Sequence, residues 1–542
     1  MIESIGWGNL PNIPHLMVEF VSGRAAIVAL LGGDWRAADT RLAAAERRAG
    51  FNREPGLSTA IRSCYGDLEI TPAVERNIEA LNQPDTLAVV TGQQVGIFGG
   101  PLYTFYKALT TILLAERLEA ETNRRVVPVF WMETADADFA EVNRISFQFM
   151  DNDPRILVYV PKDILTGRSI NFHELTPEID IVQNEIQSWL ANLPHGGVIG
   201  EAVQKAYHVG KSLPVAFQEL LSGQLGSMGL VILNPLHPAI VERTSEFWDR
   251  CLIHPDKLNK SFIIASGEIS KLHFPLQVKL REDALPILHL DENGVRRRIR
   301  GQPDRWETGE TNGLFNDSEL RRYASENPAR FTPSALLRPV LQDWLLPTWI
   351  YVGGAAEVAY HAQIGTCYDL LEIPRPLIAP RISASLIEPA ARRLLGRNGW
   401  TVKDVVGGRE ILLRSSGKPA MLADLADRGL EQLDGWLERI ERSAEEASIN
   451  INLELDRAGR KLKFQWNKLG RIILYKLAER DRTRLSHAER LLNLIMPEGM
   501  LQERHDSPLY FLAIYGDKLV QSLSSEAELF NTQHIVVDLE AV

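Results

Sequence analysis

The chain has 542 residues with a formal net charge of −11, and 45% of its residues are hydrophobic. This composition is typical of a globular protein, and the length exceeds what one hydrophobic core supports, so we expect a main domain with insertions or a second domain. The negative charge argues against nucleic acid as a partner, because phosphate binding needs a basic face, and no apolar run approaches the roughly 20 residues of a membrane span.

The three cysteines, Cys64, Cys251 and Cys367, are widely separated and show no metal-ligand spacing. They therefore indicate neither a disulfide framework nor a structural zinc site. Such cysteines are most often buried and unreactive. Few cysteines fit a reducing cytoplasm, and the first residues lack a basic region followed by an apolar one, so we expect a cytoplasmic protein without a secretory signal.

The N-terminal part of the chain is predicted to be mostly helical over residues 17–80, with 36–48 (RAADTRLAAAERR) as a typical stretch. A short apolar run at 87–90 then predicts a buried strand. The strand leads into a glycine-rich turn, and Pro101 is predicted to take the first position of an amphipathic helix, where its missing N–H would have had no partner. A buried strand that runs through such a turn into a helix is how open α/β folds build a binding crevice.

The turn after this strand contains Gly92, Gly96, Gly99 and Gly100. Glycine allows a sharp turn and a close approach of a ligand, and free N–H groups at a helix start favour anions, so the turn is a candidate binding site. It has neither G-x-G-x-x-G nor the G-K-[ST] ending of a phosphate loop, and the alternative is a tight connection that needs its glycines only for packing. The candidate substrate-binding residues here are Thr91, Gly92, Gln93, Gln94, Gly96 and Tyr103.

A second apolar run at 126–132 (VVPVFWM) predicts a parallel strand that is buried on both faces. Carboxylates that follow a central strand lie where ligands bind in doubly wound sheets. Asp136, Asp138 and Glu141 are therefore candidate catalytic residues that orient an amine or act as acid and base, and Asn143 is a candidate substrate contact. The same carboxylates are also suited to hold a metal ion, but no metal site is assigned. The alternative is a solvated loop with helix-capping aspartates.

The middle of the chain contains features typical of insertions. Residues 165–206 have a polar, helical pattern, whereas 230–233 (LVIL) predict a third buried strand before a helix that starts near Pro238. Residues 285–300 predict a hairpin, because Asn-Gly is the strongest short-range turn signal. Its arginines are suited to hold a phosphate or carboxylate, although strand side chains alternate and a solvated face is the commoner state for some of them. They are Arg296, Arg297, Arg298 and Arg300.

A second glycine turn is predicted after a helix at 331–346 and a strand at 349–352. Gly353 and Gly354 lead into a helix near Ala355, so two glycine turns of one parallel sheet are predicted to face a shared crevice. Glu357 and His361 share a helical face and suggest an acid–base pair or half a metal site, with a structural pair as the alternative. The candidate substrate-binding residues of this region are Arg338, Gly353, Gly354, Glu357, Tyr360 and, within a strand predicted at 376–385, Arg381.

The last part of the chain changes character at about residue 421. Leucines recur at three- and four-residue steps, as helical packing requires, and a second helical stretch runs over 455–495. Two long helices joined near Ser448 predict an antiparallel coiled coil, whose usual use is dimerisation.

Several blocks spread over nearly the whole chain match the pattern of one family. They are VVTGQQVGIFGGPLYTFYKA at 89–108, VPVFWM at 127–132, the acidic D-x-D-F-x-E-V-N at 136–143, LRPVLQDWLLPTWIYVGGAAEVAYHAQ at 337–363, Pro380-Arg381, and LQER at 501–504 before 508–511. In these blocks the chain resembles the bacillithiol-biosynthesis cysteine ligase family.

The resemblance implies an α/β fold with a Rossmann-like parallel-sheet core, connecting insertions and a C-terminal α-helical coiled coil, in a homodimer. It also implies a cytoplasmic ligase that adds cysteine to the amine of glucosaminyl-malate in the last step of bacillithiol biosynthesis, with ATP as the nucleotide and ADP or AMP as its product. Asp136 and Asp138 are then expected to hold the amine or accept its proton. Arg338 and Arg381 are expected to pair with the malate carboxylates.

The chain departs from the family pattern after the second strand. Family members commonly carry Glu-Asp-His-Asp there, whereas this chain has Ala135, Asp136, Ala137 and Asp138, and Asn234 stands where an acidic turn is expected. Two alternatives follow. One is a divergent member without ligase activity that acts as a metabolite-binding or scaffolding dimer, and the other is a ligase for a different amine.

The predicted organisation places the core in three parts separated by insertions. The parts are the core at 1–160, a helical insertion at 161–215, core at 216–255, a small β-containing insertion at 256–327, core at 328–415, and the coiled-coil region with its tail at 416–542.

Overall fold

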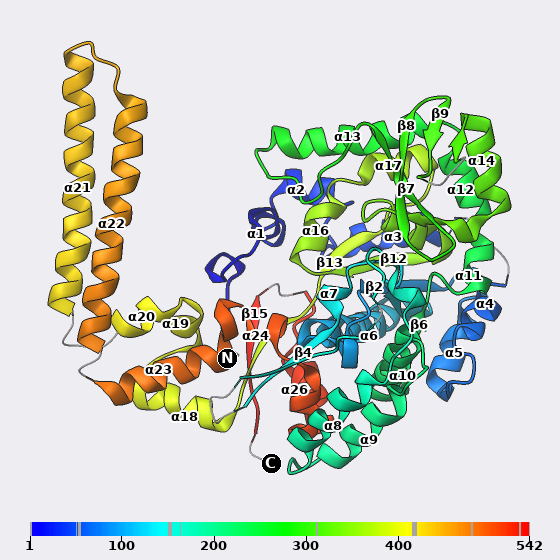
Figure 1. Cartoon of the computed structure of the whole chain (residues 1–542), viewed down its shortest axis with the longest axis horizontal. Helices are drawn as coiled ribbons and strands as arrows, with labels where there is room; N and C mark the ends of the chain where they lie inside the picture. Colours follow the sequence, from blue (N-terminus) through cyan, green and yellow to red (C-terminus); the bar gives the residue numbers. More distant parts are fainter. Residues whose placement is uncertain are drawn as a thin grey trace.

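The computed structural model describes residues 3–49, 51, 56–149, 154–162, 164–309, 313–414, 420–478, 481–530 and 533–540. A main body built around a parallel sheet carries a helical hairpin that projects away from it (Figure 1). None of the described helices combines the length and the apolar character that a membrane crossing needs.

The core of the main body is a five-stranded parallel sheet with the order β13-β12-β2-β3-β6. The strands predicted at the first glycine turn, at VVPVFWM and at LVIL are all present, and so is the strand before the second glycine turn. Because all five strands run in one direction, their carboxyl ends meet at one edge of the sheet. The strands are β2 (Leu87–Gln93), β3 (Val126–Met132), β6 (Val231–Leu233), β12 (Thr348–Gly353) and β13 (Leu377–Pro380).

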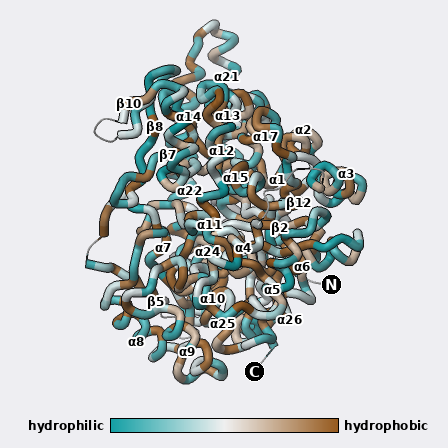
Figure 2. The backbone as a smooth tube through the Cα atoms, turned by 90° about the vertical axis from the view of Figure 1, so that its right-hand side faces the viewer, coloured by the Kyte–Doolittle hydropathy of each residue, from teal (hydrophilic) through white to brown (hydrophobic). Residues whose placement is uncertain are grey.

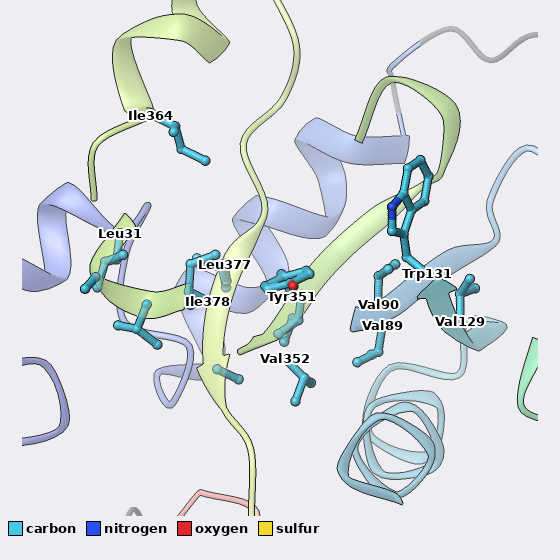
Figure 3. Packing of buried hydrophobic residues seen from close by; sticks show 14 of the residues in the cluster. Leu31, Val89, Val90, Val129, Trp131, Tyr351, Val352, Ile364, Leu377 and Ile378 are labelled. Atoms are coloured by element: carbon cyan, nitrogen blue, oxygen red, sulfur yellow. The ribbon is translucent and has the colours of Figure 1, made fainter. Parts of the chain in front are cut away.

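Alternate side chains of the central strands enter two hydrophobic cores. Val129 and Trp131 pack with Val89 and Tyr351 in the larger core, whereas Phe130 joins a second core with α6 (Leu102–Thr122) and α10 (Leu213–Leu225). Figure 3 shows the first set between the strands and the neighbouring helices. Burial on both faces explains why these strands are continuous apolar runs rather than alternating ones.

The helices predicted for residues 17–80 are present, and some of them cover part of the sheet. α3 packs on β2 and β12, and α5 packs on β3 and β6. Figure 2 shows the body turned by 90°, with α2 and α3 at its edge. The helices are α1 (His15–Val21), α2 (Ala25–Leu30), α3 (Ala38–Ala49), α4 (Leu57–Ser63) and α5 (Pro72–Ala80).

The segment between β3 and β6 forms a hairpin and then helices. A short helix, α7 (Phe139–Val142), leads into the antiparallel pair β4 (Arg144–Gln148) and β5 (Pro154–Val158). The helical prediction for 165–206 holds only from α8 (Glu178–Leu190) onward, because residues 170–172 form one 3-10 turn. α9 (Gly196–Ala206) completes the predicted stretch.

A second, antiparallel sheet lies in the predicted β insertion. Its hairpin turn is confirmed, with Gly294 at φ 74°. The prediction of a helix from residue 331 is wrong at its start, because residues 331–333 pair with β7 at the sheet edge, where Pro333 need not donate to a further strand. The strands are β7 (Ala284–Leu290), β8 (Arg296–Gln302), β9 (Arg305–Glu307), β10 (Leu314–Phe315) and β11 (Phe331–Pro333), and the surrounding helices are α11 (Pro238–Val241), α12 (Ser245–Cys251), α13 (Pro255–Lys271) and α14 (Asp317–Glu326).

The region predicted as one strand at 376–385 consists of two strands in different sheets. β13 belongs to the parallel sheet, and β14 (Ser383–Ile387) pairs with β15 (His534–Asp538), which also pairs with β1 (Ser4–Ile5). Arg381 lies in the connection rather than in the middle of a strand. The chain changes sheets at this residue.

The C-terminal region contains the predicted antiparallel helical hairpin, α21 (Ala420–Glu446) and α22 (Asn452–Ala478), with Ser448 in its turn at φ 59°. The second helix does not continue to residue 495 as predicted, because a separate helix, α23 (Arg482–Ile495), packs back on α18 (Pro389–Asn398). The remaining helices of this region are α19 (Val402–Val406), α20 (Arg409–Arg414), α24 (Gln502–His505), α25 (Pro508–Tyr515) and α26 (Asp517–Glu526).

Candidate active site

A cavity of about 650 Å³ lies at the carboxyl ends of the parallel strands. Gly92 and Gly100 from the first glycine turn and Gly354 from the second all line it. The prediction that the two turns share one crevice is therefore confirmed. Residues of β4, of the β3–α7 loop and of α24 complete its walls.

The first glycine turn is built for close packing as well as for access to the cavity. β2 extends through Gln93, and the buried Thr91 hydroxyl donates to the Val352 carbonyl (2.8 Å), which joins β2 to β12. A Cβ on Gly96 would lie 2.8 Å from the Gly100 Cα, so Gly96 serves the packing that the sequence left open as the alternative. Neither Thr91 nor Gly96 is among the described residues that line the cavity.

The backbone amides of three glycines in this turn, Gly96, Gly99 and Gly100, already have partners. The Gly96 N–H donates to the Gln94 carbonyl (3.0 Å), and the Gly100 N–H donates to that of Ile97 (3.1 Å). Pro101 is the residue before α6 rather than its first residue, and the Leu102 N–H donates to the Asp506 carbonyl (2.7 Å). The start of α6 is therefore closed by protein oxygens instead of being open to an anion.

Lys107 on α6 is a cavity residue that the sequence reasoning missed. Its ammonium donates to the Gly92 carbonyl (2.8 Å) and to Gln93 Oε1 (2.7 Å), and it forms an ion pair with Glu357. Only 3% of the side chain is exposed, and this burial lowers the pKa of Lys107 to about 8. The motif match at 89–108 included this lysine, but its helical setting gave no sign that it faces the sheet edge.

Glu357, near the start of α16 (Ala355–His361), is the carboxylate that pairs with Lys107. It also accepts the Gly354 N–H (2.8 Å) and the Tyr351 hydroxyl (2.6 Å). Burial opposes its charge, but Lys107 and these donors hold the pKa of Glu357 below its ordinary value. The carboxylate thus stays ionised and ties both glycine turns together.

The suggested pairing of Glu357 with His361 is not present. His361 is buried, with its ring 4.6 Å from that of Tyr351 and 5.1 Å from that of Tyr360, measured between centroids. Burial lowers its pKa well below the ordinary value. Within the described residues no group of three His, Cys, Asp or Glu side chains is placed to hold a metal.

A second buried ion pair joins Arg338, at the start of α15 (Arg338–Leu345), to Glu133. The two side chains are 3.1 Å apart, from Arg338 Nε to a carboxylate oxygen. Arg338 also donates to Gln342 Oε1 (2.9 Å) and to the hydroxyls of Tyr360 (2.8 Å) and Tyr351 (3.2 Å). All three nitrogens of its guanidinium therefore have protein partners.

Glu133, the first residue after β3, is the second cavity residue that the sequence reasoning missed. Burial raises the pKa of Glu133 to about 7 although Arg338 opposes the shift. A carboxyl with a pKa near neutrality can accept and return a proton at physiological pH. The signal for this residue was its position directly after a central strand.

The predicted acidic residues divide into two groups. Asp136 and Glu141 line the cavity, and the Gln94 side-chain amide donates to both, at 2.5 Å and 2.7 Å. Asp138 is exposed and is not among the described lining residues. Asn143 also lies away from the lining, where its amide donates to the Tyr159 carbonyl (3.0 Å).

One arginine of the β insertion reaches this acidic group. Arg296 lines the cavity with Nη1 4.0 Å from Asp136 Oδ1, and it donates to the Pro333 carbonyl (2.8 Å). Arg297 instead pairs with Asp291 at 2.9 Å, and Arg298 is exposed. Three of the four arginines, Arg297, Arg298 and Arg300, are exposed, as expected for a solvated hairpin, and Arg296 alone of the four lines the cavity.

Arg381 forms a third buried pair. Its guanidinium binds both carboxylate oxygens of Glu503 on α24, at 2.6 Å and 3.0 Å. Glu503 also accepts the Ser383 hydroxyl (2.9 Å), and Arg381 lies over the ring of Tyr103. Burial opposes the charge of Glu503, but Arg381 keeps its pKa below the ordinary value. The two sequence blocks that resemble the family, Pro380-Arg381 and LQER, therefore contact each other through this ion pair.

The other predicted substrate contacts are placed as follows. The cavity is lined by Gln93, Gln94, Tyr103, Gly354 and Tyr360. Gly353 is not among the described lining residues, and its carbonyl accepts the backbone N–H of Arg381 (3.0 Å). The three cysteines are free and buried, as expected for structural thiols. Burial raises their pKa values above the ordinary one.

Two family models match the chain from end to end. The model of the bacillithiol biosynthesis BshC N-terminal Rossmann-like domain matches residues 10–382, and that of the BshC C-terminal coiled-coil domain matches residues 384–539. The chain belongs to the BshC family. The fold confirms the predicted Rossmann-like core and coiled coil, and the family is the one that the motifs resemble.

Relatives named "Putative cysteine ligase BshC" are similar to this chain over most of their length. The protein of Salinibacter ruber is 30% identical over 97% of both chains. That of Solibacter usitatus is 32% identical over 86% of both chains, and that of Symbiobacterium thermophilum is 29% identical over 92% of both.

Proposed function

We propose that this chain is a ligase that joins the carboxyl group of cysteine to the amine of glucosaminyl-malate by an amide bond, the last step of bacillithiol biosynthesis. One observation carries the proposal: both glycine turns, three acidic residues after β3 (Glu133, Asp136 and Glu141) and residues of the LQER segment line a single cavity. The family's link to bacillithiol biosynthesis and the relatives' name, cysteine ligase, support cysteine as a substrate.

Amide formation requires an activated carboxyl, a neutral amine and a group that takes up the amine proton. In the proposed mechanism Asp136 and Glu141 bind the substrate ammonium and take its first proton, which leaves the neutral amine, and Gln94 holds the two carboxylates in place. Glu133 accepts the second proton as the amine attacks, because its pKa of about 7 lies near the working pH. Arg296, with Nη1 4.0 Å from Asp136 Oδ1, and Arg338, paired with Glu133, offset the negative charge of these carboxylates.

The nucleotide is part of the proposal as a co-substrate, because a carboxylate and an amine do not form an amide in water without activation. ATP would activate the cysteine carboxyl and leave as ADP or AMP. The N–H groups of Gly96, Gly99 and Gly100 in the first glycine turn donate to protein carbonyls and are not available to its phosphates. No step is therefore assigned to the amides of this turn.

The experiment is turnover by the purified full chain with cysteine, glucosaminyl-malate and ATP, followed by mass spectrometry of the thiol and chromatography of the nucleotides. Bacillithiol together with ADP or AMP supports the proposal. Binding of the metabolites without product contradicts it and supports the scaffolding alternative. Product formation only with other amines contradicts the substrate assignment. A Glu133→Gln preparation purified in parallel controls for a contaminating ligase.

A homodimer and a cytoplasmic location belong to the same proposal. A homodimer through the coiled coil is supported by apolar side chains on α22 that are about half exposed, including Leu462 (44%), Leu469 (47%) and Ile472 (50%). A cytoplasmic location is supported by three buried, unpaired thiols, which suit a reducing compartment.

A further inference from the structure

The inner cations of the cavity are already neutralised by carboxylates of the protein. Lys107 pairs with Glu357, Arg338 with Glu133, and Arg381 with Glu503. A substrate carboxylate would have to displace a buried protein carboxylate to reach any of them, and an unpaired buried charge is costly. The arginines that the resemblance suggested for the malate carboxylates are thus occupied.

Two other arginines line the same cavity with free guanidiniums. They are Arg144, the first residue of β4, and Arg504 on α24, and both are exposed. Neither side chain makes a hydrogen bond or an ion pair with any residue in the described part of the chain. They are therefore the cations that remain available to a ligand.

The backbone brings these two arginines to one wall. The Ser146 hydroxyl donates to the His505 carbonyl, and the Ser507 N–H donates to the Ser146 carbonyl (2.9 Å), so β4 and α24 are joined next to both residues. Arg144 and Ser146 are two residues apart on a strand and share its face, which is the face toward α24. Arg504 follows Glu503, whose carboxylate points inward to Arg381.

The carboxylates near this wall leave the arginines available. Glu141 accepts a hydrogen bond from Gln94, and Glu498 lines the cavity as an exposed residue. Tyr103 lies on the same side, and Arg504 is the cation that most opposes the rise in the pKa of Tyr103 caused by burial. The charge of Arg504 thus acts on a tyrosine that lines the same cavity.

We propose that Arg144 and Arg504 bind the two carboxylates of the malate arm of the amine substrate. This inference rests on the proposed function. A guanidinium offers a planar fork of donors that fits one carboxylate, and two such forks fit a dicarboxylate. The sugar amine then extends toward Asp136 and Glu141, which line the same cavity.

The test compares Arg144→Gln and Arg504→Gln with Arg322→Gln, an exposed arginine on α14 that is outside the described cavity lining. In steady-state assays we expect each cavity variant to raise KM for glucosaminyl-malate about tenfold or more, as loss of a charge-assisted pair implies, with KM for cysteine unchanged. The control variant should behave like the unmodified chain. Unchanged KM for glucosaminyl-malate in the Arg144→Gln/Arg504→Gln double variant would overturn the inference.

Calorimetry without catalysis separates this inference from the proposed ligase activity. The probes are L-malate and inorganic phosphate, titrated into the full chain and into each variant. Malate binding that is lost in both variants supports the dicarboxylate site, even if no ligation occurs and the proposed function fails. Binding of phosphate but not malate, or binding of neither, overturns the dicarboxylate assignment even where ligation is active.

Discussion

The ammonium of Lys107 and the carboxylate of Glu357 form a buried ion pair between α6 and α16, the two helices that follow the glycine turns. Lys107 also holds the Gly92 carbonyl (2.8 Å), and Glu357 accepts the Gly354 N–H (2.8 Å). The pair therefore fixes the ends of β2 and β12 relative to each other. All four residues line the cavity, so the pair is part of its wall where these neighbouring strands end.

Replacing one member of this pair is expected to destabilise the protein strongly. Lys107→Met leaves the Glu357 carboxylate buried without its cation, which costs about 3–5 kcal/mol of unfolding free energy. The double variant Lys107→Met/Glu357→Gln removes the charge while keeping an oxygen for the Gly354 N–H, so it should recover part of that loss. Urea denaturation of the two single variants and the double variant measures the coupling. A double variant whose loss equals the sum of the single losses would contradict the structural role.

The pKa of Glu133 predicts the pH dependence of the reaction. Burial raises that pKa to about 7, so the carboxylate that accepts the amine proton forms only as pH rises through this value. We expect kcat to increase with pH up to an apparent pKa of about 7, and Glu133→Gln to lose roughly 100-fold in kcat together with this limb of the profile. If kcat of the Glu133→Gln variant still rises with pH up to about 7, another group causes this pH dependence.

The same shift predicts how stability changes with pH. The folded state binds the Glu133 proton more tightly than the unfolded chain, in which a glutamate titrates near 4.5. The stabilising contribution of the proton is complete below pH 4.5 and is lost as pH rises to about 7. Glu133→Gln should therefore lose less Tm than the unmodified chain between pH 5 and pH 8. Equal losses of Tm in the two proteins would show that Glu133 does not titrate in this range.

Local sequence patterns predicted the elements of this fold well. Continuous apolar runs identified β3, β6 and β12, and the Asn-Gly pair identified the hairpin of β7 and β8. The errors occurred where pairing with a distant segment decides the structure. Residues 331–333 are a strand because β7 lies beside them, and the helix predicted through residue 495 is interrupted before α23, which packs on α18.

The site was predictable in place but not in its contacts. The two glycine turns indicated the correct sheet edge, yet Lys107 was missed because its partner Glu357 lies far along the chain. A lysine on an amphipathic helix is usually exposed, and only the tertiary fold turns this one inward. Likewise, the sequence identified Arg338 as a cation, but it could not show that Arg338 forms an ion pair with Glu133.

The two aspartates after β3 are expected to differ in their effect on activity. Asp136 lines the cavity and accepts the Gln94 amide, whereas Asp138 is exposed. The family resemblance assigned a role to both, and the placement favours Asp136. We expect Asp136→Asn to lower kcat/KM about 100-fold and Asp138→Asn to lower it much less, with both proteins folded by circular dichroism. A loss confined to Asp138→Asn would return the assignment to the exposed residue.

The projecting hairpin predicts a dimer that depends on the apolar face of α22. Leu469 and Ile472 are 47% and 50% exposed. Apolar side chains that gather on an exposed surface mark a site of interaction with another protein. Leu469→Glu/Ile472→Glu should convert a dimer of the full chain to a monomer at micromolar concentration, measured by sedimentation equilibrium. Asn467→Glu, which adds a charge at an exposed polar position of the same helix, is the control and should leave the dimer intact. A monomeric unmodified chain, or a double variant that stays dimeric, would exclude this face as the interface.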